Sequence, residues 1–176
     1  MTDVYRVYRY KKLELSKENL NLLCELYEST LPECMHLTEY EYELLLETSG
    51  FIILAFEGEE IVAGTHAVPA KEMEMYLNIL DHTFEAKVGQ IHICSVAVTK
   101  RLQGNGIGRR IWEMVLDESE RRGFTSTSAY LSTSFDWHKK VARLNSPYDK
   151  KIIQGFWSEL EALGENGDVE YQESWL

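Results

Sequence analysis

Cysteine and proline are scarce in this sequence, which has three of each among 176 residues. The cysteines, Cys24, Cys34 and Cys94, form no Cys-x-x-Cys pair, so the sequence predicts neither a disulfide framework nor a zinc ribbon. His92 and Cys94 as a metal pair lack further ligands at suitable spacing. We therefore expect a reduced, cytoplasmic protein that binds no metal.

Basic residues are also in deficit, with 18 Lys and Arg against 29 Asp and Glu and a net charge of −11. This balance disfavours a nucleic-acid-binding surface, and it is compatible with a cationic small substrate or with simple solubility. No stretch approaches the roughly 20 apolar residues of a membrane span, and the N-terminus mixes charges with tyrosines, unlike a signal peptide. We expect neither nucleic acid nor membrane as a partner.

The rest of the composition is that of a folded protein, with 44% hydrophobic residues and a length suited to one domain over residues 1–176. Alternation and β-rich composition predict a hairpin and four further strands. Helical spacing and capping residues predict four helices. Segments 70–87 and 134–145 fit no single element. Strands are predicted at 3–13, 51–57, 60–68, 90–98, 124–134 and 168–176, and helices at 16–31, 38–50, 107–123 and 146–164. Their order predicts an α/β (α+β) fold with a mixed sheet.

A glycine turn, residues 103–108 (QGNGIG), lies between a predicted buried strand and a predicted helix. The first N–H groups of a helix lack internal partners, and the helix dipole adds positive potential there. Glycines let a phosphate approach this backbone closely and adopt positive φ at little cost. Four basic residues and no acidic one lie at 100–110, which favours a bound polyanion. The spacing fits neither a P-loop nor a Rossmann fingerprint.

The stretch from Val98 to Gly108 resembles the Gln/Arg-x-x-Gly-x-Gly/Ala signature of the GCN5-related N-acetyltransferase (GNAT) family. In that family the signature joins the fourth strand to the third helix and holds the pyrophosphate of acetyl-CoA. The resemblance implies an acyl-CoA N-acyltransferase fold with six or seven strands and about four helices, and acetyl-CoA as co-substrate. It implies cofactor contacts from Val96, Ala97, Val98, Gln103, Gly104, Asn105, Gly106, Ile107, Gly108, Arg109 and, by a weaker match, Asn145.

The sequence departs from the family pattern near its end. The family has a tyrosine about seven residues beyond the asparagine that Asn145 resembles, and Ile152 stands there instead. This departure motivates an alternative in which the chain is a non-catalytic acyl-CoA sensor or interaction module.

Acetyl transfer to an amine needs a base, because a lysine-like amine has a pKa of about 10.4. His92 is the candidate base, since it lies on the strand that leads into the glycine turn; a core histidine bonded to a neighbouring strand is the structural alternative. Glu85 could act through water. Tyr148 is the candidate acid for the leaving thiolate, ahead of Tyr130. Cys94 as a nucleophile is disfavoured against a buried inert cysteine.

Together these observations predict an N-acetyltransferase that acetylates a primary amine by direct attack in a ternary complex. The acceptor is a small-molecule amine or a protein amine. The sequence leaves open its identity, the acyl-chain length, the general acid and the oligomeric state, including a homodimer.

Overall fold

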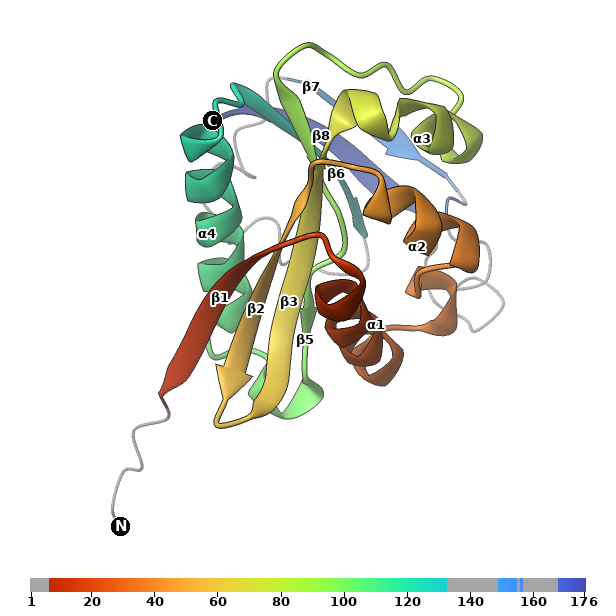
Figure 1. Cartoon of the computed structure of the whole chain (residues 1–176). Coiled ribbons are helices and arrows are strands. Elements are labelled where there is room, and N and C mark those ends of the chain that lie inside the picture. The colour runs from red at the N-terminus through yellow and green to blue at the C-terminus, as the bar shows by residue number, and fades with distance from the viewer. Residues whose placement is uncertain (1–6, 133–148, 155, 157–167) are drawn as a thin grey trace.

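The computed structural model describes residues 7–132, 149–154, 156 and 168–176, and Figure 1 shows its arrangement. The strands form one sheet in the order β1-β2-β3-β4-β6-β8-β7, with β5 beside β3. Only β4 and β6 pair in parallel within the described residues. The α/β fold with a mixed sheet is confirmed, with eight strands rather than six or seven.

The elements follow in alternating runs along the chain. The strands are β1 (Tyr8–Glu14), β2 (Phe51–Glu57), β3 (Glu60–Pro69), β4 (Gln90–Ile93), β5 (Ala97–Val98), β6 (Ser126–Ser132), β7 (Asp149–Ile153) and β8 (Val169–Trp175). The helices are α1 (Lys17–Thr30), α2 (Glu39–Leu46), α3 (Glu74–Leu80) and α4 (Ile107–Arg121), with 3-10 turns η1 (Glu33–Met35), η2 (Ala70–Glu72) and η3 (Lys100–Leu102).

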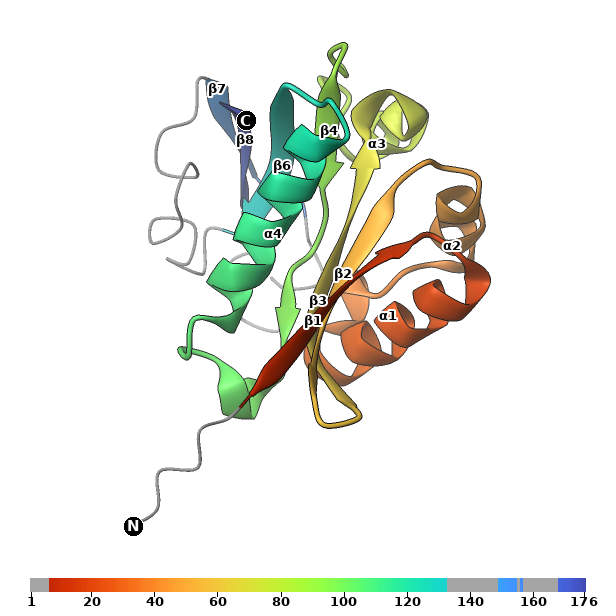
Figure 2. The ribbon, with the colours of Figure 1, turned by 60° about the vertical axis from the view of Figure 1, so that its left-hand side comes forward.

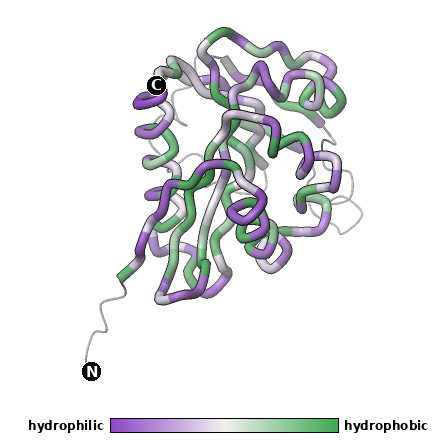
Figure 3. Tube along the Cα trace, viewed as in Figure 1, coloured by the Kyte–Doolittle hydropathy of each residue, from purple (hydrophilic) through white to green (hydrophobic). Residues whose placement is uncertain are grey.

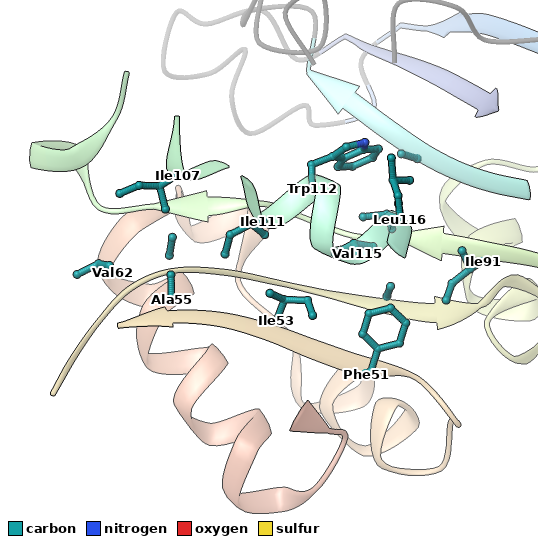
Figure 4. Close-up of a cluster of buried hydrophobic side chains, with 14 of the residues drawn as sticks. Phe51, Ile53, Ala55, Val62, Ile91, Ile107, Ile111, Trp112, Val115 and Leu116 are labelled. Carbon is teal, nitrogen blue, oxygen red and sulfur yellow. The ribbon is translucent and has the colours of Figure 1, made fainter. Parts of the chain in front are cut away.

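Helices cover both faces of the sheet. Figure 2 shows α4 on one side of the strands and α1, α2 and α3 on the other. The α4 side buries Ile111 and Val115, whose side chains face Phe51 and Ile53 of β2 in Figure 4, and Trp112 belongs to the same buried cluster. In Figure 3 the helices carry alternating hydrophilic and hydrophobic stretches, as expected for elements with one buried side.

The predicted helix starts are confirmed where a capping side chain is present. Ser16 Oγ accepts a hydrogen bond from Asn19 N at 3.2 Å, which caps α1. Thr38 and Glu41 form a reciprocal capping box at α2. The predicted hairpin is also present, with Gly58 at φ +62° between β2 and β3. These features formed as predicted because each depends on residues close in sequence.

The predicted last helix is wrong over residues 149–153, which form strand β7. This strand pairs antiparallel with β8, with Lys151 opposite Tyr171. Ser146 and Pro147 resemble a helix start, and they lie outside the described residues. The β-branched pair Ile152 and Ile153 suits an edge strand better than a helix. Ile152 therefore stands in a strand and not at a helix position.

Segment 70–87 consists of η2, α3 and a loop that closes over the sheet beside β4. Its acidic residues have structural partners: Glu72 accepts hydrogen bonds from Ser49 N and Oγ at 2.6 and 2.7 Å. Glu74 accepts one from Ala86 N at 2.8 Å, which ties the loop to α3. Phe84 and Ala86 of this loop are buried, and the Phe84 ring packs on His92 and Tyr171 of the sheet. The segment thus forms a cover over the centre of the sheet.

Candidate functional site

The predicted strand at 90–98 is interrupted by a β-bulge. Ala67 of β3 pairs with Ile93, and Gly64 of β3 pairs with Ala97. Three residues, 94–96, therefore lie opposite two residues of β3, 65–66. β4 pairs with β6 as far as Ile93, opposite Ala129, and β5 pairs with β3. The bulge therefore turns the chain away from β6, which continues to Ser132.

The backbone of Val98 is directed away from β3. Thr99 N donates to Val62 O at 2.8 Å, and Ala97 pairs with Gly64. Because backbone groups of successive strand residues point to opposite edges, the N–H and C=O of Val98 face the β6 side. Its carbonyl accepts a hydrogen bond from Gln103 Nε2 at 3.1 Å. Val96 and Val98, two of the predicted cofactor contacts, are half-buried. The backbone of Ala97, between them, pairs with Gly64 of β3.

The glycine turn has the backbone geometry that its sequence predicts. Gly104 and Gly106 have φ of +80° and +79°, and a Cβ on either would meet no protein atom within 4 Å. Gly106 is the N-cap of α4, and the first helical hydrogen bond runs from Arg110 N to Gly106 O at 3.0 Å. The backbone N–H groups of Ile107, Gly108 and Arg109 donate no hydrogen bond to any of the described residues.

Two side chains of the turn hold its shape from within. Asn105 Nδ2 donates to Leu102 O at 3.1 Å, and Gln103 bonds the Val98 carbonyl. Ile107 and Gly108 are buried at the start of α4, and Ile107 joins the core. The side chains therefore anchor the loop and leave backbone N–H groups as the free donors at the helix start.

The basic flank of the turn is less positive than its sequence suggests. Arg101 contacts Glu57 at 2.6 Å and Glu60 at 2.7 Å, both from the distant hairpin. Arg109 contacts Glu113 at 3.1 Å, and Arg110 lies 3.6 Å from the same carboxylate. Acidic residues thus pair with three of the four basic residues, so the flank attracts a polyanion less strongly than its sequence suggests, and the backbone N–H groups are unaffected.

His92 is 4% exposed in the centre of the sheet. Its Nδ1 lies 2.9 Å from Ser128 Oγ on β6, and Phe84 and Tyr130 pack on its ring with centroids 6.0 and 5.5 Å away. Burial, and secondarily the nearby His66, lowers the pKa of His92 to about 3. The ring is therefore neutral at pH 7. The bond to a neighbouring strand is the one that the structural alternative, a core histidine, predicts, and the role of His92 as base stays a prediction.

A second buried histidine, which sequence reasoning missed, fixes the bulge. Tyr27 Oη donates to the carbonyl of Ser95 at 2.7 Å and lies 3.0 Å from His66 Nδ1. Since the phenol proton goes to Ser95, His66 Nδ1 donates to the phenol oxygen. Burial lowers the pKa of His66 to about 4 and raises that of Tyr27. No local motif marks this contact, because α1, β3 and the bulge are far apart in sequence.

Cys94 is half-buried and poorly suited to act as a nucleophile. It packs beside the cluster of α1 and α3 residues, and burial raises the pKa of its thiol well above the usual value. The thiolate that a nucleophile needs is therefore disfavoured, in line with the sequence interpretation.

A buried carboxylate next to Tyr130 was seen in the sequence only as part of an acidic cluster. Asp81 is 6% exposed and accepts hydrogen bonds from Thr83 N at 2.9 Å and Tyr130 Oη at 3.1 Å. Burial raises its pKa, but hydrogen bonds led by that from Lys151 outweigh this and lower it overall. Lys151 Nζ lies 2.9 Å from Asp81 and 4.8 Å from the ring centroid of Tyr171. A cavity of about 480 Å³ adjoins this ammonium.

The remaining candidates are placed differently. Tyr148 and Asn145 lie outside the described residues. Glu85 is exposed on the loop beside Phe84. Within the described part of the chain, no three His, Cys, Asp or Glu residues cluster as metal ligands do, and no helix has the length and apolarity of a membrane span.

The architecture matches solved acetyltransferase structures over almost its whole length. The ribosomal-protein-S18-alanine N-acetyltransferase of Escherichia coli superposes with a TM-score of 0.66 at 12% identity, covering 95% of this chain and 94% of that one. Arabidopsis thaliana Naa50, bound to the bisubstrate analogue CoA-Ac-MVNAL, gives 0.66 at 16% identity, covering 94% and 97%. An agmatine N-acetyltransferase gives 0.64 at 14% identity, covering 95% and 99%.

At these identities the structural matches establish the fold alone. No curated protein matches the sequence. The family model described as Acetyltransferase (GNAT) family matches residues 17–144, which include the glycine turn, the bulge and the sheet centre. The chain therefore belongs to the GNAT acetyltransferase family.

Proposed function

We propose that the protein transfers the acetyl group of acetyl-CoA to a primary amine by direct attack in a ternary complex. The observation that carries the proposal is the start of α4, where three backbone N–H groups without described acceptors follow two glycines in the left-handed region. Residues 103–109 would hold the pyrophosphate there. The co-substrate supplies an activated acyl group as its thioester.

The bulge supports a place for the rest of the co-substrate. The Val98 backbone faces the β6 side, so Val96 and Val98 can pair with the pantetheine amides as an added strand would. An N–H of the same bulge can stabilise the oxyanion that forms on the thioester carbonyl. Asn145 and Tyr148 stay in the proposal as a cofactor contact and as the acid for the leaving thiolate.

His92 is proposed as the group that accepts the proton of the attacking amine. It is neutral at pH 7, so one ring nitrogen carries an available lone pair. The bond of Nδ1 to Ser128 leaves Nε2 for the substrate side. A positioned base of this kind contributes about 10²–10⁴-fold to a rate.

An amine as acceptor is supported by the Asp81 site. A primary ammonium of the protein itself, that of Lys151, is held there by the Asp81 carboxylate and the face of the Tyr171 ring. Among the structural neighbours are acetyltransferases named for agmatine and for a protein alanine, so the fold serves small-molecule and protein amines. The negative charge of the chain suits a cationic acceptor.

The first test is the melting temperature with acetyl-CoA. Ligand at 100 times its Kd stabilises the folded state by about 2.7 kcal/mol, which raises the melting temperature. Gly106→Asp should abolish the rise, since it places a carboxylate where the phosphates bind. No shift with millimolar acetyl-CoA would contradict cofactor binding.

A matched pair of alanine variants distinguishes weaker acetyl-CoA binding from a general loss of stability caused by backbone strain. Gly106 and Gly123 have φ of +79° and +89°, and a Cβ at either position has open space around it. Both Gly→Ala changes should destabilise the fold by about 1–2 kcal/mol. Only Gly106→Ala should weaken acetyl-CoA binding, because Gly123 lies at the other end of α4. Equal binding by both variants would overturn the assignment of the turn.

Turnover distinguishes the enzyme from the non-catalytic sensor. We expect acetylated product, detected by mass, from at least one member of a panel of polyamines, aminoglycosides and lysine peptides. Acetyl-CoA binding without turnover on any amine would favour the sensor.

A further inference from the structure

The centre of the sheet contains a row of buried polar side chains that crosses three strands. His92 of β4 pairs with Ser128 of β6, and Ser128 pairs with Glu173 of β8. The three residues therefore stand side by side on one rung of the sheet, and their side chains share one face. They are 4%, 0% and 3% exposed. We call these three residues the polar row.

Two hydrogen-bonded pairs extend along the row, His92 with Ser128 and Glu173 with Tyr171. His92 Nδ1 lies 2.9 Å from Ser128 Oγ. Ser128 is the diagonal neighbour of Tyr171 across β6 and β8, so its hydroxyl lies on the same face as the Tyr171 phenol and next to it. Tyr171 Oη donates to Glu173 Oε1 at 2.7 Å. The other carboxylate oxygen of Glu173 accepts from Lys87 Nζ, which is half exposed on the covering loop.

The donors along this chain have one consistent direction. Tyr171 gives its proton to the Glu173 carboxylate, so its oxygen is left to accept the proton of Ser128. The Ser128 oxygen then accepts from His92, which places the ring proton of the neutral histidine on Nδ1. The buried carboxylate thus sets the tautomer of a histidine two strands away and keeps its Nε2 as an acceptor.

We propose that Glu173, acting through Tyr171 and Ser128, positions His92 and provides the route by which the proton of the attacking amine leaves the site. This inference rests on the proposed function. His92 Nε2 takes a proton from the amine as the new C–N bond forms. At the same time Nδ1–H passes to Ser128, the Ser128 proton to Tyr171, and the Tyr171 proton to Glu173. Each hydroxyl ends with one proton, and His92 ends with its proton on Nε2.

The environment of His92 makes such an exit necessary. Burial disfavours a lasting imidazolium, and the ring is faced by His66 from β3, Tyr130 from β6 and the apolar Phe84 from the loop. Among these described neighbours no carboxylate touches the ring to stabilise a positive charge. Glu173 instead reaches solvent through its contact with half-exposed Lys87, where the proton can be released.

The test combines nitrogen NMR of the histidines with kinetics. In the free protein at pH 7 we expect His92 to carry its proton on Nδ1. Tyr171→Phe and Ser128→Ala should each shift it toward the Nε2–H tautomer, because the acceptor at Nδ1 is lost or reoriented. Ser126→Ala is the matched control on the same strand and face, and should leave the tautomer unchanged. An Nε2–H tautomer in the unaltered protein would overturn the proposal.

Glu173→Gln tests the end of the chain while keeping the shape of the side chain. With an accepted amine, kcat should fall at least about tenfold, and by no more than the roughly 10²–10⁴-fold effect of losing the positioned base itself. KM for acetyl-CoA should stay unchanged. An unchanged tautomer together with unchanged kcat would refute the role of Glu173. Because NMR needs no co-substrate, this result is separate from the thermal-shift test, whose failure would refute acetyl-CoA binding instead.

Discussion

Two strands on opposite halves of the same sheet, β2 and β8, bury different kinds of side chain. β2 buries six consecutive residues, 51–56, and all are apolar. β8 also buries five positions, and three of them are Gln172, Glu173 and Ser174. Both strands lie between other strands, so strand position does not explain the difference.

The difference shows which part of the sheet contributes most to stability and which part buries polar groups that contribute less. Buried polar groups stabilise a fold only when every member is bonded, whereas apolar packing has no such requirement. β2 and α4 supply the apolar packing, and β4, β6 and β8 carry the polar row next to the bulge. We expect substitutions in the first region to change stability, and those in the second to change chemistry and pH dependence.

The largest expected effect is a loss of stability in the apolar region. Ile53 of β2 is fully buried under α4, so Ile53→Ala should lower the free energy of unfolding by about 2–5 kcal/mol. Denaturant unfolding measures this change. The kcat per folded molecule should stay at the level of the unaltered protein, and a selective fall in kcat would break the division between the regions.

The next effect concerns pH in the polar region. The folded pKa of His92, about 3, is below the ordinary value of 6.5, so the unfolded chain binds more protons between these values. Stability from the neutral ring is complete above pH 6.5 and is lost as pH falls toward 3, by about 1.4 kcal/mol per pH unit. Denaturant unfolding of His92→Gln should show a shallower loss between pH 6.5 and 4. An unchanged slope would contradict the burial of a neutral ring.

A buried carboxylate on α4 should show the same sign by a different cause. Hydrogen bonds from Arg121, then from Arg122 and Lys12, outweigh burial and lower the pKa of Glu118 to about 2. Its contribution is therefore present above the ordinary carboxyl pKa and is lost as pH falls from about 4.5 toward 2. Glu118→Gln should cost about 2 kcal/mol at pH 7, measured by denaturant unfolding.

At pH 2 the unaltered protein and Glu118→Gln should differ much less, because Glu118 is then about half protonated in the folded state and almost fully protonated in the unfolded state. A constant difference from pH 7 to pH 2 would show that the cost comes from packing and not from the charge.

The smallest effect concerns the flank of the glycine turn. Arg101 is paired with Glu57 and Glu60, so Arg101→Met should change the affinity for acetyl-CoA by less than about twofold, because exposed ion pairs contribute little. Calorimetric titration at two salt concentrations checks this. A tenfold loss with a reduced salt dependence would mean that Arg101 binds the polyanion directly.

Several parts of this protein could be predicted from short stretches of sequence. The caps at Ser16 and Thr38, the hairpin at Gly58 and the turn at Gly104 and Gly106 each depend on residues within a few positions of one another. The family resemblance rests on the same turn. His92 was identified because it precedes the turn on its strand, but its tautomer and its low pKa were beyond the sequence.

What the sequence by itself determined is the backbone of the glycine turn and the order of the elements up to β6, apart from α3 and the bulge between β4 and β5, because capping, alternation and positive φ are local properties. The tertiary structure alone decided that residues 149–153 pair with β8, that acidic residues offset the basic flank, and that His92, Ser128 and Glu173 share a rung. These outcomes depend on contacts between residues far apart in the chain, and burial gives such contacts their strength.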